Sequence, residues 1–557
     1  MKKCLSVLLA VLLLVSALPI AAAAAEIKEN YDLSKPPILF IDGINAVDLV
    51  RDIGTKDEET VYPFTADDVL SLVNENRAAV WDVLDGDFTQ ENENAVIDAA
   101  ISLLEDVEMN DDGTSKYDIA ADWLYPLQTR ERITDDEDGG FDPREKLNEL
   151  KDWFFSLFRR EEEEPTEEEM MEALLQSEST YKYRYDWRLD PYENAENLQD
   201  FIDYMKELTG YDTFSLVGFS QGATVLNTYL SLYGYEDLES VVWYCGAHNG
   251  VEMVGQLFTG RIGVDPDTLT QYLSNPHSRE ASAELIAAVA QQLNALGVTG
   301  SILQYTDKII DKLLSDGAIR RLIRETVGKM PGIWSLIGDE YYEEAKAYVF
   351  SEPGDETRFA ELIEKIDAYH YNVQARSADL MAQAKAETGK IGVIAKYGRS
   401  VIPIIEHRAV QADGVIDVRG ASCGATAADL GSTLGANYVQ AVSDGHNHLS
   451  ADGVIDASTA LYPDYTWFIK NQEHSQGGDY QHDLINKIAY AEGQFTVFDD
   501  PDFPQFSVYS PIDNTTAPLT DGKLPDVFGR TFLRLRESFR ELFKKIKAFF
   551  ANLLPVS

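Results

Sequence analysis

The chain has 557 residues, enough for two to four average domains or for one large domain with insertions. It is 45% hydrophobic and 11% aromatic, so it can bury a sizeable core. The formal net charge of −48 argues against nucleic acid as a partner, because an acidic protein is repelled by the phosphate backbone.

The first 25 residues are typical of a secretory signal. Lys2 and Lys3 form a positive end, Leu5–Leu18 forms an apolar stretch, and Ala21–Ala25 forms a small-residue cleavage zone. No later stretch is apolar for long enough to span a bilayer. We therefore expect a secreted protein, extracellular or associated with the cell surface, whose main domain covers residues 26–525.

The first expected strand is the apolar run Ile38–Ile41, which ends at a glycine turn. From Asp57 to about Gln176 (residues 57–176) the pattern is helical and acidic, and we interpret it as an insertion. Within it an apolar helical stripe covers residues 147–158. Such a stripe is most often core, and the alternative is a mobile lid over an apolar site.

The central motif is Gly218-Phe219-Ser220-Gln221-Gly222. The strand-like run Phe214–Phe219 leads into it, and a helical pattern starts at Ala223. A Gly-x-Ser-x-Gly sequence between a strand and a helix predicts a nucleophile elbow, in which a strained Ser220 projects its hydroxyl. We expect Ser220 to be a catalytic nucleophile.

An oxyanion hole is expected beside this serine. In a nucleophile elbow the backbone N–H after the nucleophile, here Gln221, supplies one donor. The second donor comes from the loop after an earlier strand, and here we choose the N–H of Ile44.

A further motif, Tyr185-Asp186-Trp187-Arg188-Leu189, precedes an amphipathic helix and then Leu216–Gly222. This combination resembles the lecithin:cholesterol acyltransferase and phospholipid:diacylglycerol acyltransferase family, whose Tyr-Asp-Trp-Arg precedes the same elbow. The resemblance covers roughly Tyr181–Gly250. It implies a lipid-acting α/β hydrolase, with a mostly parallel central sheet flanked by helices and with helical cap insertions. The family commonly has His and Met where this chain has Phe219 and Gln221, so hydrolysis rather than acyl transfer is the expected chemistry.

Within the motif itself, we expect Asp186 and Arg188 to form an ion pair that fixes the loop, with Trp187 packed beneath it. These roles are structural rather than catalytic.

The next strand is expected at Ser240–Cys245, and the turn after it carries His248. His248 is a candidate for lining the pocket, although a hydrogen-bonded turn histidine is the more frequent case. Residues 251–388 are helical in pattern, either a cap or a separate helical subdomain, and the sheet resumes at Lys390–Tyr397.

The acid and the base must follow Ser220 if the chain has this fold, because its triad runs in the order Ser, acid, His. The sequence Ala-Asp-Gly-Val-Ile-Asp occurs twice, at 412–417 and 451–456. The preferred pairing is Asp452 with His474, which follows the expected last buried strand, Thr466–Ile469. This segment is similar to the Asp-Gly-x-Val…Ser…His tail of bacterial true lipases.

The alternative pairing is Asp413 with His446 or His448, and Asp456 and Asp417 are further candidate acids. The cluster around Asp444 also has donors for a cation such as calcium. Polar loop residues at this spacing more often bond one another, so no metal and no cofactor is part of the prediction.

Two cysteines, Cys245 and Cys423, follow the signal segment and form either one disulfide or two free thiols. Phe495–Pro525 is expected to be irregular. Residues 526–557 include a basic amphipathic helix, Arg530–Leu554. It is suited to docking on the body, to membrane or lipid-surface contact, or to a short coiled coil.

These features together predict a secreted serine esterase or lipase. Its substrate is an ester, with a lipid or other acyl ester favoured, and the reaction passes through an acyl-enzyme. Three alternatives remain open: an acyltransferase on lipids, a peptidase or amidase with the same triad, and a catalytically silent surface-binding protein.

Overall fold

A computed structural model describes residues 35–62 except 45, 47 and 54, and residues 75–76, 89–121, 182–263, 312–401 except 316, 405, 409–510 and 514–520. Three expected elements lie outside the described residues: the signal segment 1–25, the apolar stripe at 147–158 and the C-terminal helix within 526–557.

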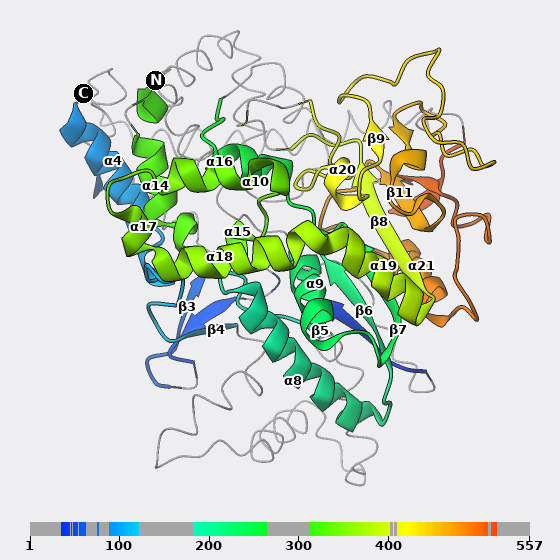
Figure 1. The fold of residues 1–557 in the computed structure, drawn as a ribbon, viewed down its shortest axis with the longest axis horizontal. Helices are drawn as coiled ribbons and strands as arrows, with labels where there is room; N and C mark the ends of the chain where they lie inside the picture. The colour runs from blue at the N-terminus through cyan, green and yellow to red at the C-terminus, as the bar shows by residue number, and fades with distance from the viewer. Residues whose placement is uncertain are drawn as a thin grey trace, which may run out of the picture.

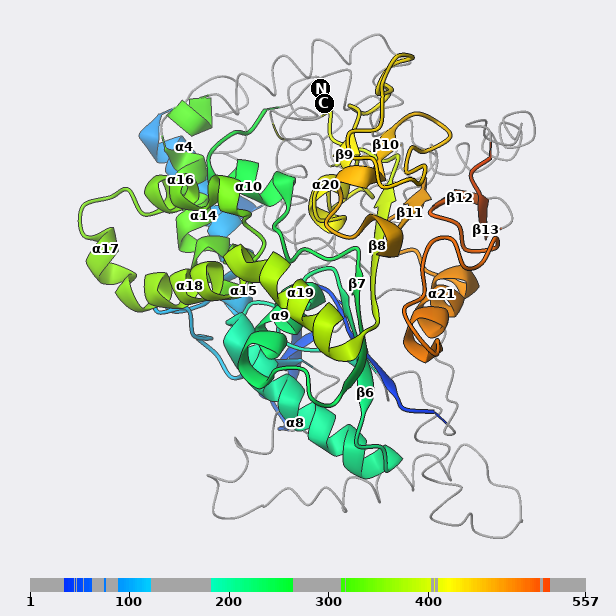
Figure 2. The same ribbon diagram turned by 45° about the vertical axis from the view of Figure 1, so that its right-hand side comes forward.

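The chain is an α/β protein built around an eight-stranded sheet with helices on both faces (Figures 1 and 2). Neighbouring strands are parallel except at one edge, where β13 runs antiparallel to β12. Across the sheet the strands are β13 (Thr515–Pro518), β12 (Phe506–Ser510), β11 (Thr466–Lys470), β8 (Ile391–Tyr397), β7 (Leu238–Tyr244), β6 (Phe214–Phe219), β1 (Ile38–Ile41) and β5 (Lys182–Tyr183).

Alternate residues of the central strands belong to two different hydrophobic clusters, as expected for a sheet buried on both faces. Leu216 of β6 is in one cluster with Leu226 of helix α9 (Gly222–Tyr233). Its neighbour Val217 is in the other cluster with Leu484 of α21 (Asp479–Tyr490). Helices α8 (Pro191–Thr209), α9 and α19 (Ser377–Thr388) therefore cover one face, and α21 covers the other.

Local sequence sets the ends of α8, which leads into β6. The side chain of Asp190 accepts a hydrogen bond from the Tyr192 N–H at 3.0 Å, and Pro191 occupies the first turn. The helix ends at Gly210, whose φ of +71° suits glycine.

Strand order reverses at β1. The chain places β5 on one side of β1 and β6 on the other, and it then adds β7, β8, β11 and β12 in sequence on the β6 side. In open α/β sheets, ligands bind outside the carboxyl ends of the strands at such a switch point. Here the switch point brings the loop after β1 beside the end of β6.

A helical layer lies beside the sheet and is formed by the described part of segment 251–388. Its helices are α10 (Glu252–Phe258), α14 (Ala318–Glu325), α15 (Pro331–Trp334), α16 (Asp339–Val349), α17 (Asp355–Arg358) and α18 (Ala360–Asn372). Helix α4 (Gln90–Ser102) packs against α14, although more than 200 residues separate them, and Figures 1 and 2 show the two side by side.

The prediction that 57–176 is helical is wrong at two places. Strands β3 (Glu59–Tyr62) and β4 (Ile119–Ala121) both pair antiparallel with β2 (Leu49–Arg51) in a separate three-stranded sheet. The segment 495–525 is likewise not wholly irregular, since β12 and β13 extend the main sheet beyond β11. Both errors concern short strands of three to five residues, whose pairing with other strands outweighs their weak local propensity.

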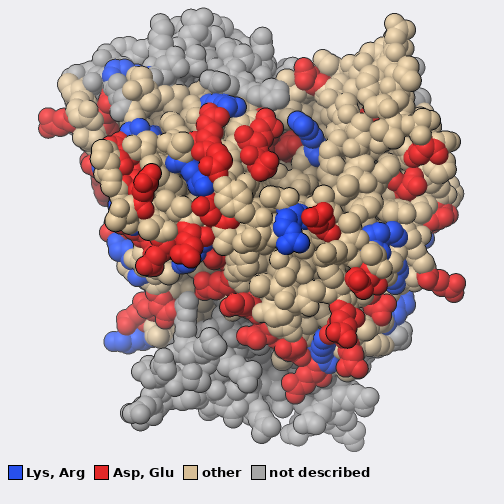
Figure 3. Space-filling model, in the orientation of Figure 1, with Lys and Arg blue, Asp and Glu red and all other residues tan. Residues whose placement is uncertain are grey.

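Acidic and basic side chains are interspersed on the face drawn in Figure 3, with acidic ones more numerous. No helix in the described part of the chain combines the length and the apolar character that crossing a bilayer requires.

Candidate active site

Ser220 lies on a sharp turn between β6 and α9. Its φ of +54° is in the left-handed region that residues other than glycine seldom adopt. Backbone hydrogen bonds hold the turn: the Ser220 N–H donates to Tyr244 O at 3.2 Å, and the Ser220 carbonyl accepts from the N–H of Ala247 at 2.9 Å. The strained conformation that the motif predicts is therefore present.

The glycines of the motif are required by close backbone approach. A Cβ at Gly222 would lie 2.2 Å from the carbonyl oxygen of Ile41, and a Cβ at Gly218 would lie 2.8 Å from Cα of Ala223. Because backbone atoms cannot move aside as a flexible side chain can, β1, β6 and α9 meet here only if these positions have no side chain.

The loop after β1 passes directly beside the serine hydroxyl. A Cβ at Gly43 would lie 2.6 Å from Cβ and 3.0 Å from Oγ of Ser220. Ile44 follows Gly43 and is buried, and Gln221 follows Ser220 at the N-terminal end of α9. Ile44 and Gln221, the two expected oxyanion donors, therefore directly follow Gly43 and Ser220, which lie close together.

A buried carboxyl group belongs to the same loop and was not expected from the sequence. Asp42 is fully buried, and its Oδ2 accepts a hydrogen bond from Arg184 Nε at 3.2 Å. Burial raises the pKa of Asp42 to about 6, although the charges of Lys182 and Arg184 oppose the rise.

The side chain of Gln221 ties the elbow to two other segments. Its Nε2 donates to the carbonyl oxygen of Trp187 at 2.9 Å and to that of Gly332, in α15, at 2.8 Å. The Gly332 N–H in turn donates to the Arg188 carbonyl at 3.0 Å. The helical layer therefore contacts the elbow directly.

The expected ion pair of Asp186 and Arg188 is confirmed. Arg188 Nη2 lies 2.5 Å from Asp186 Oδ2, and both side chains are almost fully buried. Arg188 Nη1 also donates to the Val107 carbonyl at 2.9 Å, and Trp187 packs edge-on against Tyr62. The buried ion pair thus flanks Trp187, whose carbonyl oxygen binds Gln221.

His474 is paired with Asp413. The histidine Nδ1 lies 2.6 Å from Asp413 Oδ2, and both side chains are nearly inaccessible to solvent. The other carboxylate oxygen, Oδ1, accepts from the N–H groups of Val415 at 3.0 Å and Ile416 at 2.8 Å. Burial alone would raise the pKa of Asp413, but the proximity and hydrogen bond of His474 outweigh it and hold the pKa below its usual range.

The second ring nitrogen of His474 takes no part in the contact with Asp413. Its Nε2 is buried and has no hydrogen-bond partner among the described residues. The imidazole stacks on Phe219, the residue before Ser220, with ring centroids 4.8 Å apart. The ring that contacts Asp413 after β8 therefore also lies over the end of β6.

A buried lysine on β8 holds the histidine loop. Lys396 Nζ donates to the carbonyl oxygens of Glu473, His474 and Gln476 at 2.9, 2.8 and 2.6 Å. Burial lowers the pKa of Lys396. Sequence reasoning missed this residue, although a lysine that ends the apolar run Ile391–Ala395 is the signal that could have identified it.

The predicted pairing of Asp452 with His474 is wrong. Asp452 Oδ2 accepts from Lys470 Nζ at 2.7 Å and from the Tyr397 hydroxyl at 3.0 Å, and Oδ1 accepts from Ser450 Oγ at 2.6 Å. Lys470 at the end of β11 thus binds the carboxylate. The observed pair therefore combines Asp413, the acid of the alternative pairing, with His474, the base of the preferred pairing.

The remaining candidates have other contacts. His446 and His448 lie beside Asp444 and Asp464 rather than beside Asp413. Asp417 and Asp456, the further candidate acids, cap the N-termini of short helical segments. Asp417 accepts from the Gly420 N–H at 2.7 Å, and Asp456 accepts from the Ser458 N–H at 3.0 Å.

His248 and the two cysteines are also placed. His248 is fully buried, burial lowers its pKa to about 3, and its Nε2 lies 3.2 Å from Cys423 Sγ. Cys245 and Cys423 are both free thiols. Cys245 Sγ lies within 4.8 Å of the facing Asp413 and His474 atoms, and burial raises its pKa.

Known proteins show little similarity to this chain. No family model and no curated protein matches the chain. A solved structure of a Tle4-Tli4 complex is similar over 66% of this chain and 76% of that chain, with 15% sequence identity and a TM-score of 0.25. A TM-score of that size does not indicate a shared fold.

Proposed function

We propose that the protein is a serine hydrolase with an α/β-hydrolase fold, in which Ser220, Asp413 and His474 form the catalytic triad. The observation that supports this most directly is the His474–Asp413 contact, with the free Nε2 of the same ring above the end of β6. The three residues occur in the order Ser, acid, His that the fold requires. All three follow the carboxyl ends of parallel strands.

In this mechanism His474 Nε2 takes the proton from the Ser220 hydroxyl as Oγ attacks an ester carbonyl. Asp413 accepts the Nδ1–H and so fixes the tautomer that leaves Nε2 able to accept a proton. Its ionised form also stabilises the imidazolium that results. His474 then protonates the leaving alcohol, and water hydrolyses the acyl-enzyme by the same route.

The N–H groups of Ile44 and Gln221 would bind the oxyanion of the tetrahedral intermediate. Each such donor contributes about 3 kcal/mol to lowering the barrier. The fixed positions of Gly43 beside Ser220 Oγ and of the Gln221 side chain on two carbonyls support this role, because preorganised donors need no rearrangement during the reaction.

The substrate class that we propose is a carboxylic ester, with a lipid or other acyl ester preferred. Secretion and lipid-surface contact by the C-terminal helix belong to the same proposal. Both rest on the sequence alone.

The test is hydrolysis of p-nitrophenyl butyrate and p-nitrophenyl palmitate by the wild type and by Ser220→Ala, with fluorophosphonate labelling of each. We expect activity and labelling in the wild type and neither in the variant. An inert, unlabelled wild type with an intact circular dichroism spectrum would contradict the proposal. Cleavage of amides but not of esters would correct the substrate class to that of a peptidase.

A further inference from the structure

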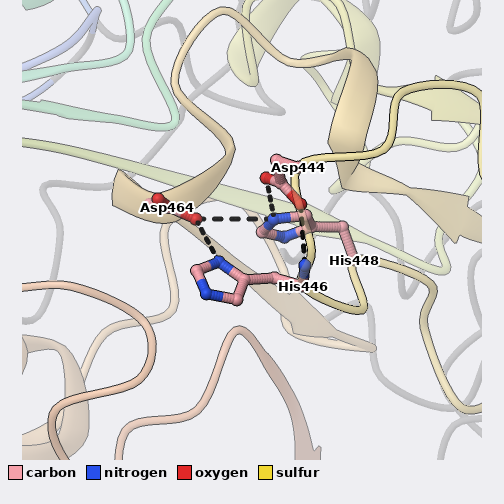
Figure 4. Close-up of side chains that lie close together, drawn as sticks. All are labelled: Asp444, His446, His448 and Asp464. Carbon is pink, nitrogen blue, oxygen red and sulfur yellow. Dashed lines mark hydrogen bonds and ion pairs between the residues drawn. The ribbon is translucent and has the colours of Figure 1, made fainter.

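A second cluster of titratable side chains lies apart from the proposed triad. It consists of Asp444, His446 and His448, on one loop, and Asp464, in the short helical turn Pro463–Tyr465 before β11 (Figure 4). One nitrogen or oxygen of each side chain lies within 4.8 Å of those of the other three. Sixteen residues separate His448 from Asp464, so folding and not local spacing alone assembles the cluster.

The separations suit a single small cation. His448 Nε2 lies 2.9 Å from Asp444 Oδ2 and 3.4 Å from Asp464 Oδ1, and His446 Nδ1 lies 3.5 Å from the same Asp464 oxygen. In a tetrahedral zinc site with bonds of about 2.0–2.1 Å, neighbouring donor atoms are about 3.3 Å apart. Two of the three measured separations are close to this value, and the third is shorter.

The hydrogen bonds of Gln505 determine the tautomer of His448. Gln505 Nε2 donates to the carbonyl oxygens of Pro463 at 2.7 Å and Thr466 at 3.3 Å, so its Oε1 is the atom that faces His448 Nδ1 at 2.8 Å. An amide oxygen only accepts, and Nδ1 must therefore carry the hydrogen. In the neutral ring the lone pair of Nε2 then points at two carboxylate oxygens.

This arrangement is the one that metal-binding histidines have. A ligating imidazole usually donates its other N–H to an oxygen acceptor, which orients the ring. His448 is fully buried, and Asp464 Oδ1 is a buried oxygen without a hydrogen-bond partner among the described residues. A proton on Nε2 would satisfy Asp444 at 2.9 Å and leave Asp464 Oδ1 unsatisfied, whereas a cation between them satisfies both.

The loop around the cluster is held in place before any cation binds. Gln440 accepts from the His448 N–H at 2.7 Å and donates to the His446 carbonyl at 3.1 Å. Asp444 Oδ1 accepts from the His446 N–H at 2.9 Å. Phe498 covers one side, with its ring centroid 4.3 Å from that of His446.

We propose that Asp444, His446, His448 and Asp464 bind one Zn²⁺ ion. Two imidazoles and two carboxylates favour zinc over calcium, which prefers oxygen ligands alone. The site precedes β11, whereas His474 follows the other end of that strand. The ion therefore has a structural role: it ties the loop 440–449 to the start of β11.

The experiment measures zinc in the whole purified protein after equilibration with Zn²⁺ and gel filtration, together with thermal unfolding in Zn²⁺ and in EDTA. We expect about one zinc per chain and a melting temperature a few degrees higher with Zn²⁺, because the ion binds the folded state. Replacement by Co²⁺ should give the strong visible absorption of a tetrahedral site.

His446→Ala and Asp464→Asn should each lose the bound zinc and the difference in melting temperature. His446 is half exposed, so its replacement leaves the fold intact. His482→Ala, on α21, is the matched control and should keep both properties. A wild type without zinc, or the same zinc content in all variants, would overturn the proposal. In the latter case Cys245, Asp413 and His474 would be the next site to examine.

Discussion

His474 Nδ1 lies 2.6 Å from Asp413 Oδ2, across 61 residues of sequence, with both side chains buried. Two separate networks hold the partners of this contact. Backbone N–H groups of Val415 and Ile416 fix the carboxylate, and the Lys396 ammonium holds the carbonyls around the imidazole. A buried pair that is held from both sides keeps its geometry, as the proposed role of His474 as a general base requires.

The two carboxylates that the sequence offers to His474 can be distinguished by matched substitutions. Asp413→Asn should lower kcat by about 10³–10⁴-fold, because the amide cannot hold the productive tautomer or stabilise the imidazolium. Asp452→Asn should leave kcat within about threefold and lower the free energy of unfolding by about 1–3 kcal/mol, since it weakens the contacts with Lys470 and Tyr397. Steady-state kinetics and urea unfolding of both variants check this. The reverse pattern would assign the acid to Asp452.

Gly43→Ala should reduce kcat by about 100-fold, because the new methyl group would lie 2.6 Å from Ser220 Cβ and displace the nucleophile or the loop of Ile44. Gly493→Ala is the control, since a Cβ there meets no atom within 4 Å. Kinetics on p-nitrophenyl butyrate, with circular dichroism for the fold, provide the measurement. Equal activity of the two variants would mean that the loop after β1 takes no part in catalysis.

Lys396→Met should lower kcat by about 10–100-fold while changing KM little, since it frees the histidine loop but touches no substrate. Lys390→Met is the control: Lys390 just precedes the same strand and donates to Ala489 O at 2.9 Å, away from His474. Kinetics are measured at a temperature where both variants are folded. The downfield proton resonance of the His474–Asp413 hydrogen bond should weaken or exchange faster in Lys396→Met alone. An unchanged resonance would mean that Lys396 stabilises the fold but does not position His474.

The pH dependence of stability should carry a contribution from Asp42. Its pKa is about 6 in the folded protein and 3.8 ordinarily, so between these values the folded state binds a proton that the unfolded state has lost. This contribution to stability is full below about pH 4 and is lost as the pH rises through 6, a change of about 3 kcal/mol. The wild type should therefore lose stability relative to Asp42→Asn as the pH rises from 4 to 7. The measurement is the difference in unfolding free energy between the two proteins at each pH. A constant difference would show that Asp42 does not titrate in this range.

The sequence by itself determined the features that reside in a few consecutive residues. Gly218–Gly222 between an apolar strand and a helix predicted the strained Ser220 correctly, because steric contacts within the turn leave few other conformations. Runs such as Ile38–Ile41, Ile391–Tyr397 and Thr466–Lys470 were recognisable as buried strands from their apolar character alone. The Asp186–Arg188 pair followed from two residues in one tight loop.

Only the tertiary structure decided which acid meets His474. The two copies of Ala-Asp-Gly-Val-Ile-Asp are locally alike, so no local property separates Asp413 from Asp452. The distinction comes from cations on neighbouring strands: Lys470 neutralises Asp452, and Lys396 draws the loop of His474 toward Asp413. Asp464 likewise reaches the histidine cluster only through folding, because it lies in the turn before β11 and not on the loop of His446 and His448. Contacts between segments far apart in sequence depend on strand order and register, which the pattern of residues along the chain does not specify.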